Sequence, residues 1–284
     1  MSSKGGTYQN QVGGFLHIKN DYDTIWLDEE IMNLCMGDIS MKKFILFLLV
    51  LLIIPTFCMA RKSVPFMTGA IVNNQNEVVA VQVNSPAYSI GIRPLDKITK
   101  IITSDNTVHT SDIKQVIDKE GEKTLRIEFL HKQDSEYAPM SGTIQAKKLN
   151  DAETRTTFLV VGKEEDIFKK VIRTLKFDPK LSLYLPMQNV DADNKFITVY
   201  SSVDKHGAKG IGDYVTRFPS SAVKNLETQG TIVVGDTSNP DISMVKVNLA
   251  FKASWDNFFS KGSESPASSG VMERLLVERL YSDL

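Results

Sequence analysis

Residues 85–101 decide the fold and read Ser85-Pro-Ala-Tyr-Ser-Ile-Gly-Ile-Arg-Pro-Leu-Asp-Lys-Ile-Thr-Lys-Ile101. From Lys97 onward, apolar and polar residues alternate, which is typical of a strand with one buried face. Two runs rich in β-branched residues, 69–72 and 78–83, precede this segment and are bounded by Asn-rich turns. Residues 124–130 follow it with the same period of two. The pattern therefore predicts a small antiparallel sheet.

A single helix is expected between these strands, at residues 110–121. Thr110 or Ser111 can cap its N-terminus, and Gly121 ends it. The spacing predicts one apolar helix face, formed by Ile113, Val116 and Ile117.

The segment 85–101 resembles the PDZ signature of bacterial envelope proteins, in which Ser-Pro-Ala opens a short helix and Gly-Leu or Gly-Ile closes it. A Pro-Gly-Asp turn then leads into a strand. The helix at 110–121 and the strand Leu125–Leu130 fall where that family has its groove helix and last strands, so the resemblance covers residues 64–148. Two departures occur. Leu95 stands where the family usually has Gly, so we expect a turn of a different type, and Thr103-Ser-Asp-Asn106 replaces the usual Asn-Gly.

The resemblance implies a PDZ-like, partly open β-barrel with a groove helix. Such a domain binds an extended peptide as an added strand, and backbone N–H groups of a tight loop capture the terminal carboxylate. Carried over, the peptide-binding residues are Phe66, Met67, Thr68 and Gly69 in the loop, Ala70 and Ile71 in the edge strand 70–72, and Ile113, Val116 and Ile117 in the helix wall. Two alternatives remain open: these apolar residues are ordinary core, or the groove is filled by the protein's own chain.

In residues 155–284 the spacing of apolar residues differs from that of the first part, and it predicts an α+β domain. Helices are expected at 164–176 and at Val271–Leu284, and the stretch 262–270 reads as a flexible connector. Strands are expected at Leu181–Leu185, Phe196–Ser201, Thr231–Val234 and Ser243–Ser254. This order is loosely similar to α+β modules of outer-membrane lipoproteins, which act in assembly. No functional residue is carried over from this weak similarity.

The first 60 residues predict export rather than a fold. Residues 41–60 have a positive start, an apolar run and a small-residue cleavage signal, as in a secretory signal peptide. The apolar stretch 44–60 is at the short end for a membrane span, so a retained anchor is the alternative to cleavage, and Phe57 disfavours lipidation of Cys58. Residues 1–40 are then a non-structural leader or the result of a misassigned start, or a short cytoplasmic tail if the anchor is kept.

Composition excludes several functions. The 33 basic and 34 acidic residues give a net charge of -1, which offers no reason to bind nucleic acid. The two cysteines, Cys35 and Cys58, lie in the leader, so a processed chain has no disulfide or cysteine-bound metal.

No catalytic motif was found. A trypsin-like set and His-Glu-x-x-His are absent from the sequence. His109, His131 and His206 read as surface or turn residues, and the loop from Asp191 lacks the Gly and Glu of a calcium site. Ser-x-x-Lys occurs at 202–205 and 221–224 and supports only a rival serine hydrolase.

We therefore expect an exported, periplasmic or membrane-anchored adaptor in the cell envelope, not an enzyme, without cofactors or metals. It would bind peptide tails or protein strands of envelope proteins and associate with the membrane, if at all, through 44–60. A structural, self-associating envelope subunit is a further alternative.

Overall fold

The computed structural model describes residues 66–119, 124–133, 136–145, 147–148, 155–204, 206, 223–256 and 261–282. All of them belong to a compact unit that spans Lys62–Leu284. The expected leader, signal peptide and anchor in residues 1–60 lie outside the described residues. Among the helices of the described part, none has the length and apolarity needed to cross a membrane.

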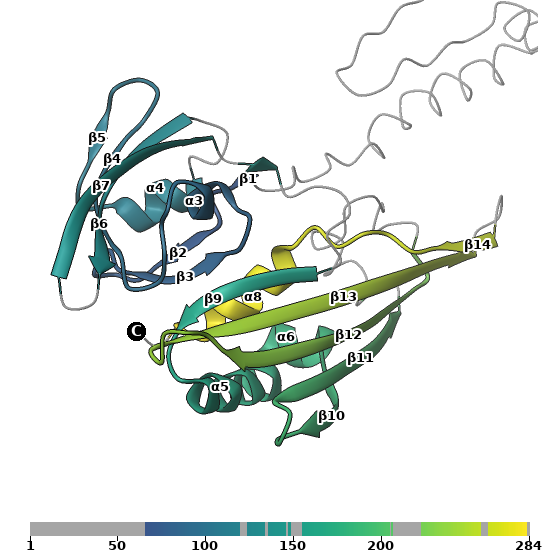
Figure 1. Cartoon of the computed structure of the whole chain (residues 1–284). Coiled ribbons are helices and arrows are strands. Elements are labelled where there is room, and N and C mark those ends of the chain that lie inside the picture. The colour runs from purple at the N-terminus through teal and green to yellow at the C-terminus, as the bar shows by residue number, and fades with distance from the viewer. Residues whose placement is uncertain are drawn as a thin grey trace, which may run out of the picture. The chain divides into compact units, whose positions relative to one another are not determined.

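The first half of the unit contains short strands and two short helices (Figure 1). Their bounds are β1 Phe66–Met67, β2 Ala70–Val72, β3 Val78–Gln82, α3 Pro86–Ser89, β4 Lys97–Ile102, β5 Val108–His109, α4 Ile113–Lys119, β6 Thr124–Gln133, β7 Glu136–Gln145 and β8 Lys147–Lys148. β5, β4, β6 and β7 form a four-stranded antiparallel sheet, and β1 pairs with β8. β6 extends beyond the expected end at residue 130, because β6 and β7 form one long hairpin.

The second half has longer strands and three helices. Their bounds are β9 Arg155–Val161, α5 Glu164–Phe177, α6 Pro179–Tyr184, β10 Met187–Asp191, β11 Phe196–Asp204, β12 Asn225–Asp236, β13 Ile242–Asp256, β14 Lys261–Glu264 and α8 Val271–Arg279. Figure 1 shows α5, α6 and α8 on one face of this antiparallel sheet. The predicted α+β class is therefore correct.

One sheet connects the two halves. Its strand order is β10-β11-β12-β13-β9-β3-β2, with β14 added on β13. Ala80 pairs with Val160 and Val81 with Leu159, so β3 lies directly beside β9. Two segments that the sequence assigns to different domains thus share backbone hydrogen bonds.

Both faces of β2 and β3 are buried, each in its own hydrophobic cluster. Ile71, Val79 and Ala80 belong to cluster 1, which also contains the apolar sides of α5 and α8. Ala70 and Val81 belong to cluster 2, together with the apolar side of α4. A strand buried on both faces needs an unbroken apolar run, which explains Val78-Val-Ala-Val81.

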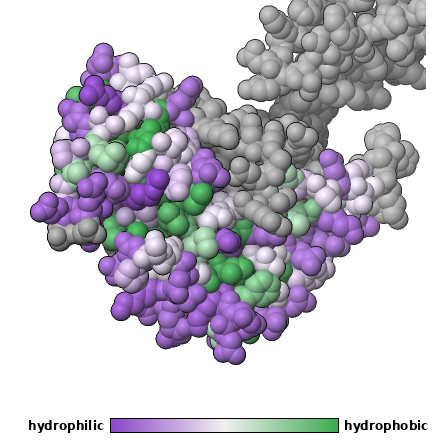
Figure 2. Space-filling model, in the orientation of Figure 1, coloured by the Kyte–Doolittle hydropathy of each residue, from purple (hydrophilic) through white to green (hydrophobic). Residues whose placement is uncertain are grey.

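Helix α5 forms as predicted. Glu164, Glu165 and Asp166 occupy its first turn, where the helix dipole favours negative charge. Its apolar side is buried in cluster 1, and each fully buried large side chain stabilises the fold by roughly 1.5–3 kcal/mol. The outer surface is largely hydrophilic, with apolar side chains gathered near the centre of the view (Figure 2).

Two predicted segments are wrong. Leu181–Leu185 is not a strand but lies mostly in α6, because the Asp178 carboxylate accepts hydrogen bonds from the N–H groups of Lys180 and Leu181, and Pro179 favours the first helical position. The expected connector at 262–270 contains most of β14 and two buried serines, Ser268 and Ser269.

Candidate functional site

The candidate site lies at β2, the last strand of the large sheet, which pairs with β3 and packs against α4. A tight turn at Thr68 and Gly69 leads into it. Gly69 has φ +87°, a conformation that side chains other than hydrogen disfavour. A Cβ at Gly69 would also lie 2.0 Å from the Ser85 Cβ, so the turn requires glycine on both counts.

The backbone of β2 has hydrogen-bonding groups directed away from β3. The Gly69 carbonyl accepts a hydrogen bond from the Gln82 N–H at 2.8 Å, and Ile71 pairs with Ala80. In an antiparallel ladder such pairs alternate with pairs whose groups point outward. The Ala70 carbonyl therefore points away from β3, while the Ala70 N–H donates to the Thr68 Oγ1 at 3.3 Å. The register shifts between Ile71 and Val72, but the Asn73 N–H donates to the Glu77 carbonyl at 2.9 Å, so the Val72 N–H between these inward residues also points away from β3. These outward groups are the ones that an added strand would use.

The predicted helix wall is packed against β2. Ile113, Val116 and Ile117 are all buried in cluster 2, together with Ala70 and Val72. Sequence reasoning placed these α4 residues beside the edge strand correctly. Because they are buried in the protein's own core, a ligand side chain can contact them only after α4 moves away from β2.

Ile71 lies elsewhere. Its side chain is 7% exposed and belongs to cluster 1, on the face of β2 opposite to α4. It therefore does not line the space between β2 and α4, and a charge there would disrupt the core. Phe66 and Met67 form β1 and pair with Lys148 and Lys147, which ties the entry of the loop to β8.

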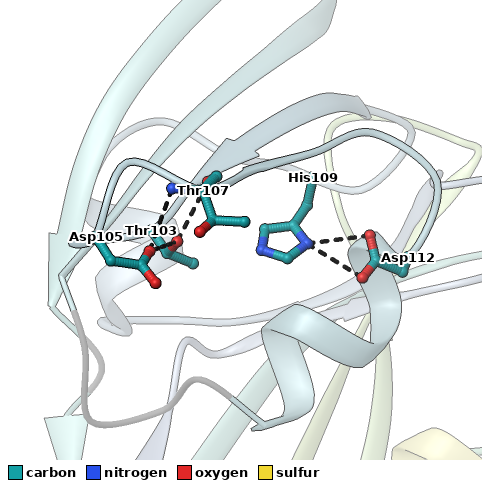
Figure 3. A network of polar contacts seen from close by, with 5 residues as sticks. All are labelled: Thr103, Asp105, Thr107, His109 and Asp112. Atoms are coloured by element: carbon teal, nitrogen blue, oxygen red, sulfur yellow. Dashed lines mark hydrogen bonds and ion pairs between the residues drawn. The ribbon is translucent and has the colours of Figure 1, made fainter.

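A polar network holds the start of α4 (Figure 3). His109, on β5, points its Nδ1 toward the Asp112 carboxylate at 3.1 Å, directly before the helix. In the preceding turn, the Asp105 carboxylate accepts hydrogen bonds from the Thr103 hydroxyl and the Thr107 N–H. These bonds, led by that from Thr103, lower the pKa of Asp105 to about 2. The helix begins at Ile113, three residues later than the expected start at residue 110.

The turn at Leu95 corrects a prediction. Leu95 has φ +75°, so the chain keeps the left-handed conformation that glycine usually supplies, although the residue differs. The Leu95 N–H donates to the Val78 carbonyl at 2.9 Å. The buried Asp96 carboxylate accepts from the Arg93 N–H at 2.8 Å and from the His131 Nδ1 at 2.9 Å. Burial raises the pKa of Asp96, and these donors oppose the rise.

One buried acid was missed by sequence reasoning. Glu273 lies in the first turn of α8, a position where an exposed carboxylate is expected from the helix dipole. Instead it is fully buried, and neither carboxylate oxygen has a hydrogen-bond partner of normal geometry. Burial raises the pKa of Glu273, and the nearby Ser268 hydroxyl counteracts this only in part. No sequence signal distinguishes such an acid from a capping one.

The remaining candidates have structural partners or lie outside the described residues. The Ser202 hydroxyl contacts the Asn225 Oδ1 at 3.1 Å, and its partner in the Ser-x-x-Lys pattern, Lys205, is not described. Ser221, of the second pattern, is also outside. Asp191 accepts three hydrogen bonds within the β10–β11 turn, and the Asn194 side chain leads in lowering its pKa. The described residues contain no cluster of three or more potential metal ligands.

The comparisons with known proteins give no family. No protein-family model matches the chain, and no curated protein matches it.

Proposed function

We propose that this protein is an exported adaptor of the bacterial envelope that binds an extended or C-terminal peptide as an added strand on β2. The observation that carries the proposal is the backbone of β2, whose Ala70 carbonyl and Val72 N–H are directed away from β3. Peptides recognised by strand addition obtain their affinity from such main-chain groups.

The module that binds the peptide is PDZ-like. Its element order, β2-β3-α3-β4-β5-α4-β6-β7, fits the resemblance of residues 85–101. The glycine turn before β2 fits the same scheme, because it lets a carboxylate approach the backbone closely. In this reading the four-stranded sheet and the β2–β3 pair form the partly open barrel, and the second half of the unit docks on an envelope assembly.

Binding requires α4 to move. Val116 is 5% exposed and packs in the same cluster as Ala70 and Val72, so a ligand side chain has no space beside it until the helix shifts. A protein whose competent state is a minor one binds with reduced apparent affinity. Association should therefore be slow, and its observed rate should level off at high peptide concentration.

The ligand is expected to end in an apolar residue. The α4 wall consists of aliphatic side chains, and full burial of a Leu or Val side chain contributes about 1.5–3 kcal/mol. That gain is large enough to offset part of the cost of moving α4.

The test uses residues 62–284, which contain both hydrophobic clusters. A library of peptides with free C-termini would be selected for binding, and the best peptide measured by fluorescence anisotropy. Val116→Ala leaves the last side chain of the peptide with fewer wall contacts and a residual cavity, so it should weaken binding. The matched control is Val81→Ala, the same change in the same cluster but on β3.

The outcomes separate the proposal from its rivals. Weakening by Val116→Ala alone, together with a loss of affinity when the peptide is amidated, supports it. Equal effects of both variants would contradict it, because they would reflect stability and not contact. A serine-reactive fluorophosphonate label would reveal the hydrolase alternative, and light scattering across a concentration series would reveal self-association.

A further inference from the structure

The end of α5 and the following α6 form an exposed corner, here called the basic–apolar corner and defined as residues 173–183. It carries two strongly exposed large apolar side chains: Phe177 is 68% exposed and Leu183 is 51% exposed. Single exposed apolar side chains are normal on a protein surface. Two of them in one short segment, surrounded by basic residues, indicate a contact surface.

Within each helix, the helical spacing places the exposed apolar side chain beside basic ones. In α6, Pro179 and Lys180 precede Leu183 by four and three residues, so the three share a face, while Leu181 and Tyr184 point into cluster 1. In α5, Arg173 is three and four residues before Lys176 and Phe177, which places these three together as well. The surface over α5 is largely hydrophilic in Figure 2.

The corner has an excess of positive charge. Arg173, Lys176 and Lys180 are exposed, and the single acid of the segment is Asp178. That carboxylate is already engaged, because it caps α6 and forms an ion pair with the Arg279 Nε at 3.1 Å. The Lys176 Nζ lies 5.4 Å from the centre of the Phe177 ring, so a cation stands beside the protruding aromatic group.

We propose that the basic–apolar corner docks on an anionic phospholipid surface. Phe177 and Leu183 enter the boundary between headgroups and acyl chains, and the three cations contact lipid phosphates. Apolar side chains among basic ones are the chemistry by which amphipathic segments bind membrane surfaces, and the charge complements anionic lipid. This contact is separate from peptide binding at β2 and from any anchor in residues 44–60.

The test is partitioning of residues 62–284 onto vesicles. This part contains both hydrophobic clusters and every described element, and a thermal melt confirms that each variant folds. Vesicles of phosphatidylcholine alone are compared with an equimolar mixture of phosphatidylcholine and phosphatidylglycerol. Binding is expected only to the anionic vesicles and should weaken as salt screens the charges.

Variants identify the surface. The double variant Lys176→Glu/Lys180→Glu should lower partitioning at least about 30-fold, since each basic residue near an anionic surface contributes about fivefold. Lys114→Glu/Lys246→Glu makes the same charge change at exposed lysines elsewhere and should lower it less. Phe177→Ser/Leu183→Ser should also reduce binding, whereas Val108→Ser, at a side chain that is 54% exposed on β5, should not.

Three results would overturn the proposal. They are equal binding to neutral and anionic vesicles, equal loss in the corner and control charge variants, and self-association in sedimentation that disappears with Phe177→Ser/Leu183→Ser. The last result would make the corner an interface between copies of the chain. None of them bears on the peptide site.

Discussion

Truncation of Val81 to alanine should destabilise both halves of the protein, although its side chain is buried in cluster 2 alone. Val81 is fully buried in cluster 2, and its strand β3 pairs with β9 of the other half. Removing two carbons costs about 1.6 kcal/mol of transfer free energy, and the residual cavity raises this to about 2.5 kcal/mol. With a urea dependence near 2.5 kcal/mol per M for a chain of this size, the midpoint should fall by about 1 M.

Trp255 reports on the other half. It is the single tryptophan of residues 62–284, it lies near the end of β13, and its indole packs against Gly262. If β2 and β3 bind the two clusters into one cooperative unit, Trp255 fluorescence and far-UV circular dichroism will show the same transition. Val81→Ala will then shift both midpoints equally.

The control is Val108→Ala, the same chemical change at an exposed side chain on β5, which should leave both midpoints unchanged. The reasoning is refuted if Val81→Ala moves the circular dichroism transition while the Trp255 transition stays in place. That outcome would mean that the β3–β9 pairing does not couple the two halves.

Three further predictions concern single residues. Glu273→Gln should gain stability relative to wild type as pH rises above the ordinary Glu pKa of 4.5. Burial raises the pKa of Glu273 in the folded state above 4.5, so wild type keeps its full stability below pH 4.5. As pH rises from 4.5 to the folded-state pKa, wild type loses up to about 1.4 kcal/mol of unfolding free energy per pH unit, whereas the Gln variant does not. A stability difference in urea melts that does not change with pH would contradict this. Asp178→Ala should cost about 1 kcal/mol, because α6 loses an N-cap that accepts two backbone hydrogen bonds; an unchanged thermal midpoint would exclude that role. Leu95→Val should destabilise more than Leu95→Gly in the same assay, because φ is +75° and β-branched residues tolerate this region worst; the reverse order would be evidence against the turn geometry.

Local patterns predicted local structure well. The acids of the first turn and the apolar spacing predicted α5 to within a residue of its observed bounds, because both signals lie within the helix itself. The segment Leu181–Leu185 failed because Leu-Ser-Leu-Tyr-Leu alternates like a strand. The cap at Asp178 and the proline after it were the stronger signal, and they predict a helix.

Long-range pairing could not be predicted from such patterns. Residues 78–81 form an unbroken apolar run, which indicates burial on both faces, yet nothing in the run indicates β9 as the neighbour. Ile71 was assigned to the groove because the sequence did not indicate that a second set of strands and helices covers the other face of β2. Its side chain points to cluster 1, which exists only because residues far along the chain fold onto that face of β2.

The sequence predicted that α4 lies beside β2, but not how closely the two pack. The sequence placed the α4 wall beside the edge strand, and the structure brings Ile113, Val116 and Ile117 onto Ala70 and Val72. Whether a helix packs on its neighbouring strand or leaves a groove depends on a balance of packing energies, which residue spacing does not report.

The central claim is that a peptide adds to the outer edge of β2. The most direct measurement is amide hydrogen exchange of residues 62–284 with and without a selected peptide that has a free C-terminus. The account predicts new protection at the Val72 amide, where the N–H points away from β3, and altered exchange in α4 as the helix shifts. Unchanged exchange at Val72 and α4, with protection at β7 or β10 instead, would contradict it.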